Sequence, residues 1–349
     1  MAIGQAAAET IRIATYNTEL DRGGPGLLLR DILSGDDPQV VAVSQVISRI
    51  SPDILVLQRV DYDLGLKAVS ALRDAIAEQG AEYPYIFALR PNTGLYTGLD
   101  MDGDGRVGEA RDAQGYGEFA GQSGMAVLSR LPIDQTQVQD FSEMLWRDLP
   151  GAILPHHNGQ PFPSDEALAI QRLSTVGHWV VPVALENTVL DLMIFHASPP
   201  VFDGPEDRNG KRNYDEIKFW QLFLDGSLGP PPDGAFTLIG VANLDPMDSD
   251  GRKEAIRALL EDDRLQDPQP MRNGKVVQDP AHIGDPQLDT ADWPEPGPGA
   301  LRVDYILPSS DLVVTDAGVY WPTEGTADAD LMHNASRHRL VWVDLDFGD

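Results

Sequence analysis

The sequence contains no cysteine, which excludes disulfide bonds, thiolate metal sites and cysteine nucleophiles. It has no run of about 18 apolar residues, so we expect no membrane partner and no membrane-spanning helix. Basic residues are scarce, because 26 Lys and Arg face 55 Asp and Glu, for a formal net charge of −29. Such a surface repels phosphate backbones, so a nucleic-acid partner would need a local basic patch or bound cations. The acidic excess suits divalent-cation binding, or solubility alone.

The chain has 349 residues, of which 42% are hydrophobic, so it is long for one domain but sufficient for a large sandwich. It has no internal repeat and no linker that separates two cores. We therefore expect one domain over residues 10–349, with insertions near residues 91–122 and 267–299.

Residues 1–9 are small, mostly uncharged and without core-like periodicity. Ala6 and Ala8, just before Glu9, resemble the end of a secretory signal whose charged and apolar regions are missing. We expect a residual signal or flexible segment here, and export to the periplasm or the extracellular space. A flexible native N-terminus is the alternative interpretation.

Several short apolar runs of strand-like composition end in polar side chains. The polar groups that follow these runs are Asn17, the segment from Gln58 to Asp63, His196, Asn243 with Asp245, Asp304, and the segment from Ser336 to His338. Each one alone is as readily a solvated turn. In layered α/β folds, however, ligands bind at such strand ends. We therefore expect these side chains to share one pocket at a sheet edge.

The order and spacing of these segments resemble the endonuclease/exonuclease/phosphatase superfamily over almost the whole chain. The resemblance rests on TYN (15–17), DILVLQ (53–58), SGMAVLSRLP (123–132), FH (195–196), LIGVANLDP (238–246), RVDYIL (302–307) and SRH (336–338). It implies a four-layered α/β sandwich, in which two mixed, mostly antiparallel sheets pack face to face with helices outside. It also implies divalent-metal-dependent hydrolysis of a phosphoester.

The resemblance assigns catalytic roles by position. His338 is the catalytic histidine and Asp304 its orienting partner, because a histidine of near-neutral pKa needs a carboxylate to handle protons at a phosphate. His196 is a second phosphate-facing histidine, and Asn243 positions the nucleophile. Asn17 is expected to orient the metal or the substrate phosphate.

Three positions depart from the family pattern. The metal-binding glutamate that usually follows LQ is Arg59 here, the aspartate of GDxN is Val241, and the aspartate of SDH is Arg337. Valine can neither accept a proton nor bind a metal. Arginine places a fixed positive charge where a metal would otherwise sit.

Two interpretations remain open. In the first, Asp61, Asp63 and Asp245 hold a catalytic Mg²⁺ or Mn²⁺, while Arg59 and Arg337 bind the substrate phosphate as bidentate donors. The chain is then an exported, monomeric, metal-dependent phosphoesterase that acts on a small molecule or a nucleic acid. In the second, the centre is inactivated and the protein is a non-catalytic, Ca²⁺-stabilised binding protein.

A separate acidic segment has the spacing of a calcium loop. Asp100, Asp102 and Asp104 occupy positions 1, 3 and 5, and a glycine follows for the sharp turn. The usual glutamate at position 12 is replaced by Arg111, and the adjacent Asp112 is a candidate substitute. We expect a structural Ca²⁺ that orders the insertion near residues 91–122, with a plain acidic loop as the alternative.

Overall fold

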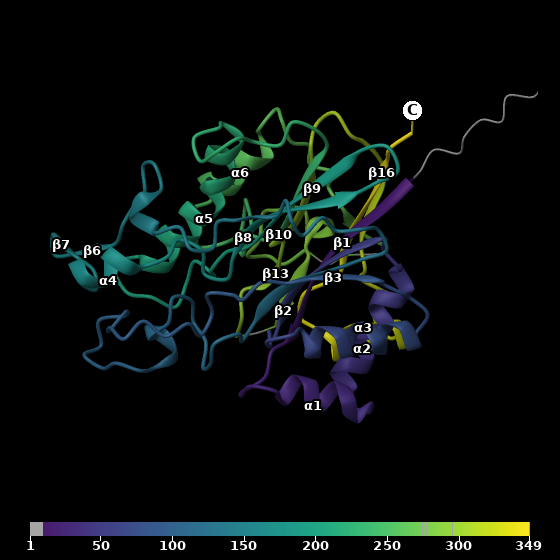
Figure 1. The fold of residues 1–349 in the computed structure, drawn as a ribbon, viewed down its shortest axis with the longest axis horizontal. Coiled ribbons are helices and arrows are strands. Elements are labelled where there is room, and N and C mark those ends of the chain that lie inside the picture. Colours follow the sequence, from purple (N-terminus) through teal and green to yellow (C-terminus); the bar gives the residue numbers. More distant parts are fainter. Residues whose placement is uncertain (1–9, 274–275, 277, 295, 349) are drawn as a thin grey trace, which may run out of the picture.

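The computed structural model describes residues 10–273, 276, 278–294 and 296–348, and is shown in Figure 1. The predicted signal remnant at residues 1–9 lies outside the described residues. The chain forms two large sheets that pack face to face, with helices on their outer faces. This arrangement confirms the predicted four-layered α/β sandwich.

The first sheet has seven strands in the order β11-β15-β16-β1-β2-β4-β3. Their bounds are β11 (Met271–Arg272), β15 (Val313–Val319), β16 (Val341–Asp346), β1 (Thr10–Leu20), β2 (Ile54–Val60), β4 (Gly124–Ser129) and β3 (Tyr85–Phe87). The β1–β2 and β11–β15 pairs are parallel, and the other pairs are antiparallel.

The second sheet has five strands in the order β14-β10-β9-β8-β5. They are β14 (Asp304–Pro308), β10 (Phe236–Val241), β9 (Val189–His196), β8 (His178–Ala184) and β5 (Gln139–Asp140). Only β9 and β10 run parallel. Two small hairpins are added, formed by β6 (His156–His157) with β7 (Gln160–Pro161) and by β12 (Ala291–Trp293) with β13 (Gly299–Leu301).

Helices cover the outer face of each sheet. The first sheet carries α1 (Leu27–Ser34), α2 (Pro38–Ile50), α3 (Lys67–Glu78) and α7 (Ala327–Ala335), and the second carries α5 (Arg208–Leu224) and α6 (Glu254–Leu260). The short α4 (Asp165–Ile170) and the 3₁₀ turns η1 (Ala110–Asp112), η2 (Trp146–Asp148) and η3 (Pro286–Leu288) lie in the connections. No helix in the described part of the chain is long and apolar enough to cross a membrane.

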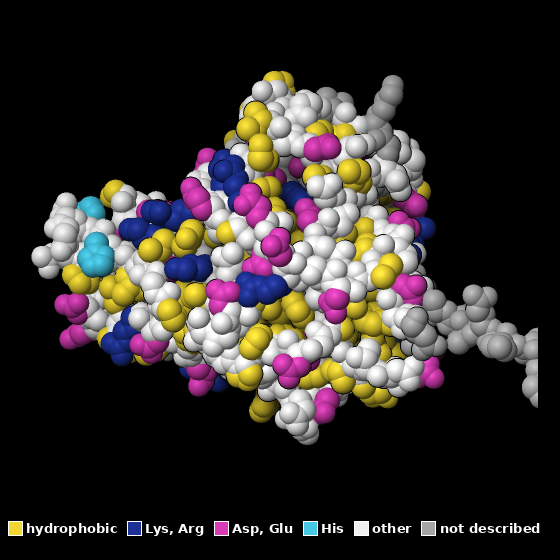
Figure 2. Space-filling view, turned by 90° about the horizontal axis from the view of Figure 1, so that it is seen from above, with side chains coloured by type: hydrophobic (Ala, Val, Ile, Leu, Met, Phe, Trp, Pro, Cys, Tyr) yellow, Lys and Arg dark blue, Asp and Glu magenta, His cyan; other side chains and the backbone are white. Residues whose placement is uncertain are grey.

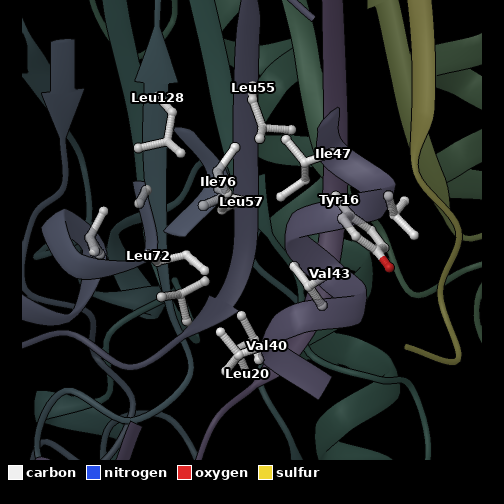
Figure 3. Close-up of a cluster of buried hydrophobic side chains, with 14 of the residues drawn as sticks. Tyr16, Leu20, Val40, Val43, Ile47, Leu55, Leu57, Leu72, Ile76 and Leu128 are labelled. Carbon is white, nitrogen blue, oxygen red and sulfur yellow. The ribbon is translucent and has the colours of Figure 1, made fainter. Parts of the chain in front are cut away.

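Local sequence explains the helix boundaries where the caps are strong. Helix α2 begins at Pro38. Asp37 is its N-cap, and the Asp37 side chain accepts a hydrogen bond from the backbone N–H of Val40. Figure 3 shows the resulting packing, in which Val43 of α2 and Leu72 of α3 meet Leu57 of the first sheet. One apolar layer lies between each sheet and its helices. A third apolar layer lies between the two sheets and contains alternate residues of the central strands.

Truncation of Leu72 tests the outer layer. Its side chain is fully buried in the cluster of Figure 3, so Leu72→Ala should lower the free energy of unfolding by about 2–5 kcal/mol. Leu33 on α1 is 71% exposed, and Leu33→Ala should change stability by less than about 0.5 kcal/mol. Urea unfolding followed by circular dichroism measures both; equal effects would contradict the packing described here.

Candidate active site

The candidate site lies at the strand ends, where polar side chains continue the alternation of the inter-sheet layer. In the second sheet the apolar residues of that layer include Ile194, Ile239 and Ile306. Two residues further along the same faces come His196, Val241 and Asp304. Val241 pairs with His196 on one side and with Asp304 on the other. In the first sheet the same phase places Asn17 directly opposite Gln58. A period of two therefore brings these groups into the space between the sheets.

His338 is held between a carboxylate and an amide. Its Nδ1 lies 2.9 Å from Oδ2 of Asp304 and its Nε2 lies 3.0 Å from Nδ2 of Asn17. Asp304 is itself fixed by the hydroxyl of Thr290, which donates to Oδ2 at 2.9 Å. All four side chains are buried. The Asp304 acceptor assigns the Nδ1–H tautomer to His338, which leaves Nε2 for proton transfer.

His196 is a second histidine, uncharged, near the hydrogen-bonded series of Thr290, Asp304, His338 and Asn17. Its Nδ1 lies 3.2 Å from Oε1 of Gln58, and its Nε2 lies 3.5 Å from Nδ2 of Asn243. Burial, together with the nearby Arg59 and His338, lowers the pKa of His196 to about 3. The imidazole is therefore uncharged at neutral pH. Asn243 is anchored because its amide donates to the carbonyl of Ala197 at 2.8 Å.

Two facing β-bulges deliver charged groups to the same place. The register of β1 against β2 shifts between Asn17 and Leu20, and the register of β2 against β4 shifts between Gln58 and Val60. Glu19 and Arg59 occupy these irregularities with left-handed φ values of 50° and 53°. Each costs about 1 kcal/mol for a residue with a Cβ. Bulges next to active sites commonly re-aim a side chain in this way.

Glu19 is the centre of an ion-pair cluster. Arg59 Nη1 donates to its Oε1 at 3.0 Å, and Arg337 donates through Nε at 3.0 Å, through Nη2, and through its backbone N–H to Oε2 at 2.9 Å. Arg59 Nη2 also pairs with Asp21 at 2.8 Å. Burial alone would raise the pKa of Glu19, but the bonds from Arg337 and the charge of Arg59 outweigh it and lower the pKa to about 2.

These groups line one cavity of about 1640 Å³. Its wall includes the side chains described above, namely Asn17, Glu19, Asp21, Arg59, His196, Asn243, Arg337 and His338. Other parts of the wall come from the loops around Asp102, Phe202 and Trp293. Figure 2 shows one face of the molecule, on which hollows lined by hydrophobic side chains lie among interspersed basic and acidic groups.

The three aspartates predicted to hold a catalytic metal do not line this cavity. Asp61 accepts hydrogen bonds from the backbone N–H groups of Arg22 and Ser123, and burial raises its pKa to about 6. Asp63 caps α3 through two backbone N–H groups at its first turn. Asp245 accepts three backbone hydrogen bonds in the loop after β10. Their carboxylates organise loops, so the structure does not bring them together as a metal site.

Sequence reasoning missed four residues of the site. Glu19 lies on β1 and Asp21 directly follows this strand, but the bulge that turns Glu19 into the cavity leaves no signature in the alternation of the sequence. Thr290 and Trp293 belong to the insertion near residues 267–299, whose strand β12 bridges to His338. The Trp293 ring meets the His338 ring edge-on at 5.2 Å. This insertion is therefore part of the site wall.

The predicted calcium loop forms an acidic cluster, of which Asp102 lines the cavity. Asp100, Asp102 and Asp112 each present a carboxylate oxygen within 4.8 Å of the others. Asp104 is not part of this group, and its carboxylate accepts the backbone N–H of Arg106 at 2.8 Å. Burial is the main reason that the pKa of Asp102 is raised, and the neighbouring carboxylates add to it.

Comparisons with known proteins place this geometry in a family. The model of the endonuclease/exonuclease/phosphatase family matches residues 14–338. The chain belongs to the endonuclease/exonuclease/phosphatase family. Members of this family are phosphoesterases and nucleases that usually use divalent metals. Comparison with curated protein sequences gives no match.

Solved structures of the endonuclease/exonuclease/phosphatase family share the fold. A member from Beutenbergia cavernae is 18% identical with a TM-score of 0.55, and the match covers 97% of this chain and 72% of that one. Sphingomyelinase C from Streptomyces griseocarneus is also 18% identical, with a TM-score of 0.51 and coverage of 96% and 99%. A mannosyl-6-phosphatase from Bacteroides thetaiotaomicron is 13% identical, with a TM-score of 0.51 and coverage of 97% and 100%.

The donor groups at the end of the cavity near His338 do not fit the divalent ion that the family usually carries. Among the residues that the structure describes, Asp100, Asp102 and Asp112 form the one group of three acidic or histidine side chains close enough to share an ion. Beside the histidines, Glu19 and Asp21 are ion-paired with arginine, and Asp304 is bonded to His338. Two fixed cations there oppose a third.

The lowered pKa of Glu19 predicts a pH-dependent contribution to stability. A carboxylate whose folded pKa lies below its ordinary value of 4.5 stabilises the protein above that value and loses its effect as the pH falls toward about 2. Glu19→Gln should therefore cost on the order of 2 kcal/mol at pH 7, and the cost should shrink between pH 5 and pH 3. Urea unfolding across this range measures it.

The matched control is Glu78→Gln at the exposed end of α3. This substitution should change stability little at any of these pH values. A cost at Glu19 that stays constant from pH 7 to pH 3 would contradict the ion-pair account.

Proposed function

We propose that the chain binds a phosphoester in this cavity and hydrolyses it, with His338 as the residue that handles the proton. The observation that carries the proposal is the buried line from Thr290 through Asp304 to His338, ending at Asn17. A histidine held in one tautomer by a carboxylate is the arrangement that general acid–base catalysis requires.

The reaction adds a water oxygen to phosphorus and breaks the bond between phosphorus and the leaving alcohol oxygen. His338 Nε2 takes the proton of the water, Asp304 stabilises the imidazolium that forms, and the proton then passes to the departing alcohol. The Asn17 amide occupies Nε2 in this structure, so the substrate replaces that contact. The neutral His196 accepts a hydrogen bond at Nε2 from a hydroxyl of the substrate or the water.

The size and charge of the surroundings favour a substrate of limited length. The net charge of −29 disfavours a long polyanion, while the cavity of about 1640 Å³ accommodates more than a phosphate group. The hydrolysis of a small phosphodiester or phosphomonoester is therefore the activity to test first.

Hydrolysis of bis-p-nitrophenyl phosphate and p-nitrophenyl phosphate tests the proposal. His338→Ala should lower kcat/KM by about 10²–10⁴-fold, because it removes the proton-transfer group. His333→Ala on α7 is the matched control, since that histidine is exposed and should leave turnover unchanged. The preferred ester separates a diesterase from a phosphatase. Equal loss in both variants, or turnover that survives His338→Ala, would refute the assignment.

A non-catalytic binding function is the second candidate, and one observation favours it. Val241 is fully buried between His196 and Asp304, at the position where the family has an aspartate for the nucleophile. If the chain is silent and Val241→Asp creates turnover, the scaffold is catalytic and this version is disabled. If both are silent while a phosphoester still binds, the protein is a binding protein.

We also propose that the Asp100, Asp102 and Asp112 cluster holds Ca²⁺. The donors are hard carboxylate oxygens, which Ca²⁺ prefers. The loop around them is already shaped, because Asp112 accepts the backbone N–H groups of Met101, Gly108 and Glu109. An ion here would neutralise three carboxylates that repel one another.

Thermal unfolding with Ca²⁺, with Mg²⁺ and with a chelator tests this site. Ca²⁺ should raise Tm by a few degrees at saturating concentration, since binding to the folded state stabilises it. Asp100→Asn should abolish the shift. Asp134→Asn is the matched control, because Asp134 is exposed and also accepts a backbone N–H. A shift that persists in Asp100→Asn would place the ion elsewhere.

A further inference from the structure

The Glu19 carboxylate has all its lone pairs engaged by donors of the protein. A carboxylate offers about four lone-pair positions. Those of Glu19 are taken by one N–H group of Arg59 and by three N–H groups of Arg337. No acceptor capacity remains for an ion.

The charge of the cluster is also balanced without an ion. Glu19 and Asp21 carry two negative charges, and Arg59 and Arg337 carry two positive ones. Arginine does not lose its proton in proteins, so these positive charges are permanent. A divalent cation would have to displace a guanidinium from Glu19 and would then remain within a few ångströms of it.

The guanidinium groups keep donors available for a ligand. Arg59 and Arg337 have side chains that are 30% and 54% exposed, and both line the cavity beside His338. Among the described residues, Nε of Arg59 and Nη1 of Arg337 donate to no protein group. Guanidinium groups bind phosphate oxygens through paired N–H donors.

We infer that Arg59 and Arg337, held by Glu19, bind the phosphoryl group of the ligand in place of a divalent ion, so that this centre works without a catalytic metal. The inference rests on the proposed phosphoester function. It accounts for the two facing bulges, because they are the device that positions Glu19 and Arg59 for each other. Glu19 is then a positioning residue for two substrate-binding arginines.

Calorimetric binding of phenylphosphonate, a phosphoester analogue that resists hydrolysis, tests the inference. The chain should bind it with a Kd that changes less than twofold between EDTA and excess Mg²⁺. Arg337→Gln should weaken binding at least tenfold in EDTA, and Arg337→Lys should recover part of it, because lysine keeps the charge but loses the fork. Arg30→Gln on α1, an exposed arginine paired with Asp31, is the matched control and should bind normally.

A second measurement does not depend on the ligand. Manganese titration followed by electron paramagnetic resonance is made in the Asp100→Asn background, which removes the acidic cluster. This chain should take up no tightly bound Mn²⁺. The double variant Arg59→Glu with Arg337→Asp adds two carboxylates and removes two cations, and should gain one site. Circular dichroism confirms that each variant is folded.

The outcomes separate the two proposals. Phosphonate binding that requires Mg²⁺, or a tight Mn²⁺ site that disappears in Glu19→Gln, overturns the metal-free centre and leaves the phosphoester function standing. Absence of phosphonate binding with and without metal overturns both. Metal-independent binding that Arg337→Gln leaves intact overturns the role of the arginines.

Discussion

The packing of the two sheets against each other is the constraint on which the rest of the structure depends. Alternate residues of the central strands must be apolar to fill the layer between the sheets, and Ile194, Ile239 and Ile306 do so in the second sheet. The same alternation continues past the end of that layer. Polar side chains that follow in phase are therefore forced into the space between the sheets, where Asp304 and His196 lie close to the residues of β1 and β2.

The end of the cavity near His338 contains two groups of residues. One follows the family pattern, and the other departs from it. His338, Asp304 and Asn17 keep the contacts that proton transfer needs. Beside them, Glu19 and Asp21 form a neutral cluster of ion pairs with Arg59 and Arg337, in which the Glu19 carboxylate is fully engaged. Both parts line one cavity, so a ligand that reaches His338 also meets the two arginines. Two fixed cations therefore lie beside His338 in this cavity.

The insertions have different relations to the site. The segment near residues 267–299 supplies Thr290, which fixes Asp304, and Trp293, which packs against His338. The segment near residues 91–122 supplies the acidic cluster, of which Asp102 lines the same cavity. Loops placed on a rigid double sheet thus determine the shape of the cavity, while the sheets determine the position of the histidines.

The sequence by itself predicted the four-layered fold through its resemblance to the family. It predicted the grouping of Asn17, His196, Asp304 and His338 from the polar residues that follow apolar runs, because alternation is a local pattern that a period of two converts into a face. Only the tertiary structure decided which partners the charged residues bind. Asp61, Asp63 and Asp245 also follow strands, yet their carboxylates accept hydrogen bonds from backbone N–H groups. Glu19 was invisible in the pattern, since a bulge changes the phase of a strand and depends on the register of its neighbours. A carboxylate binds whichever donor lies closest, and which donor that is depends on distances that only the folded chain sets.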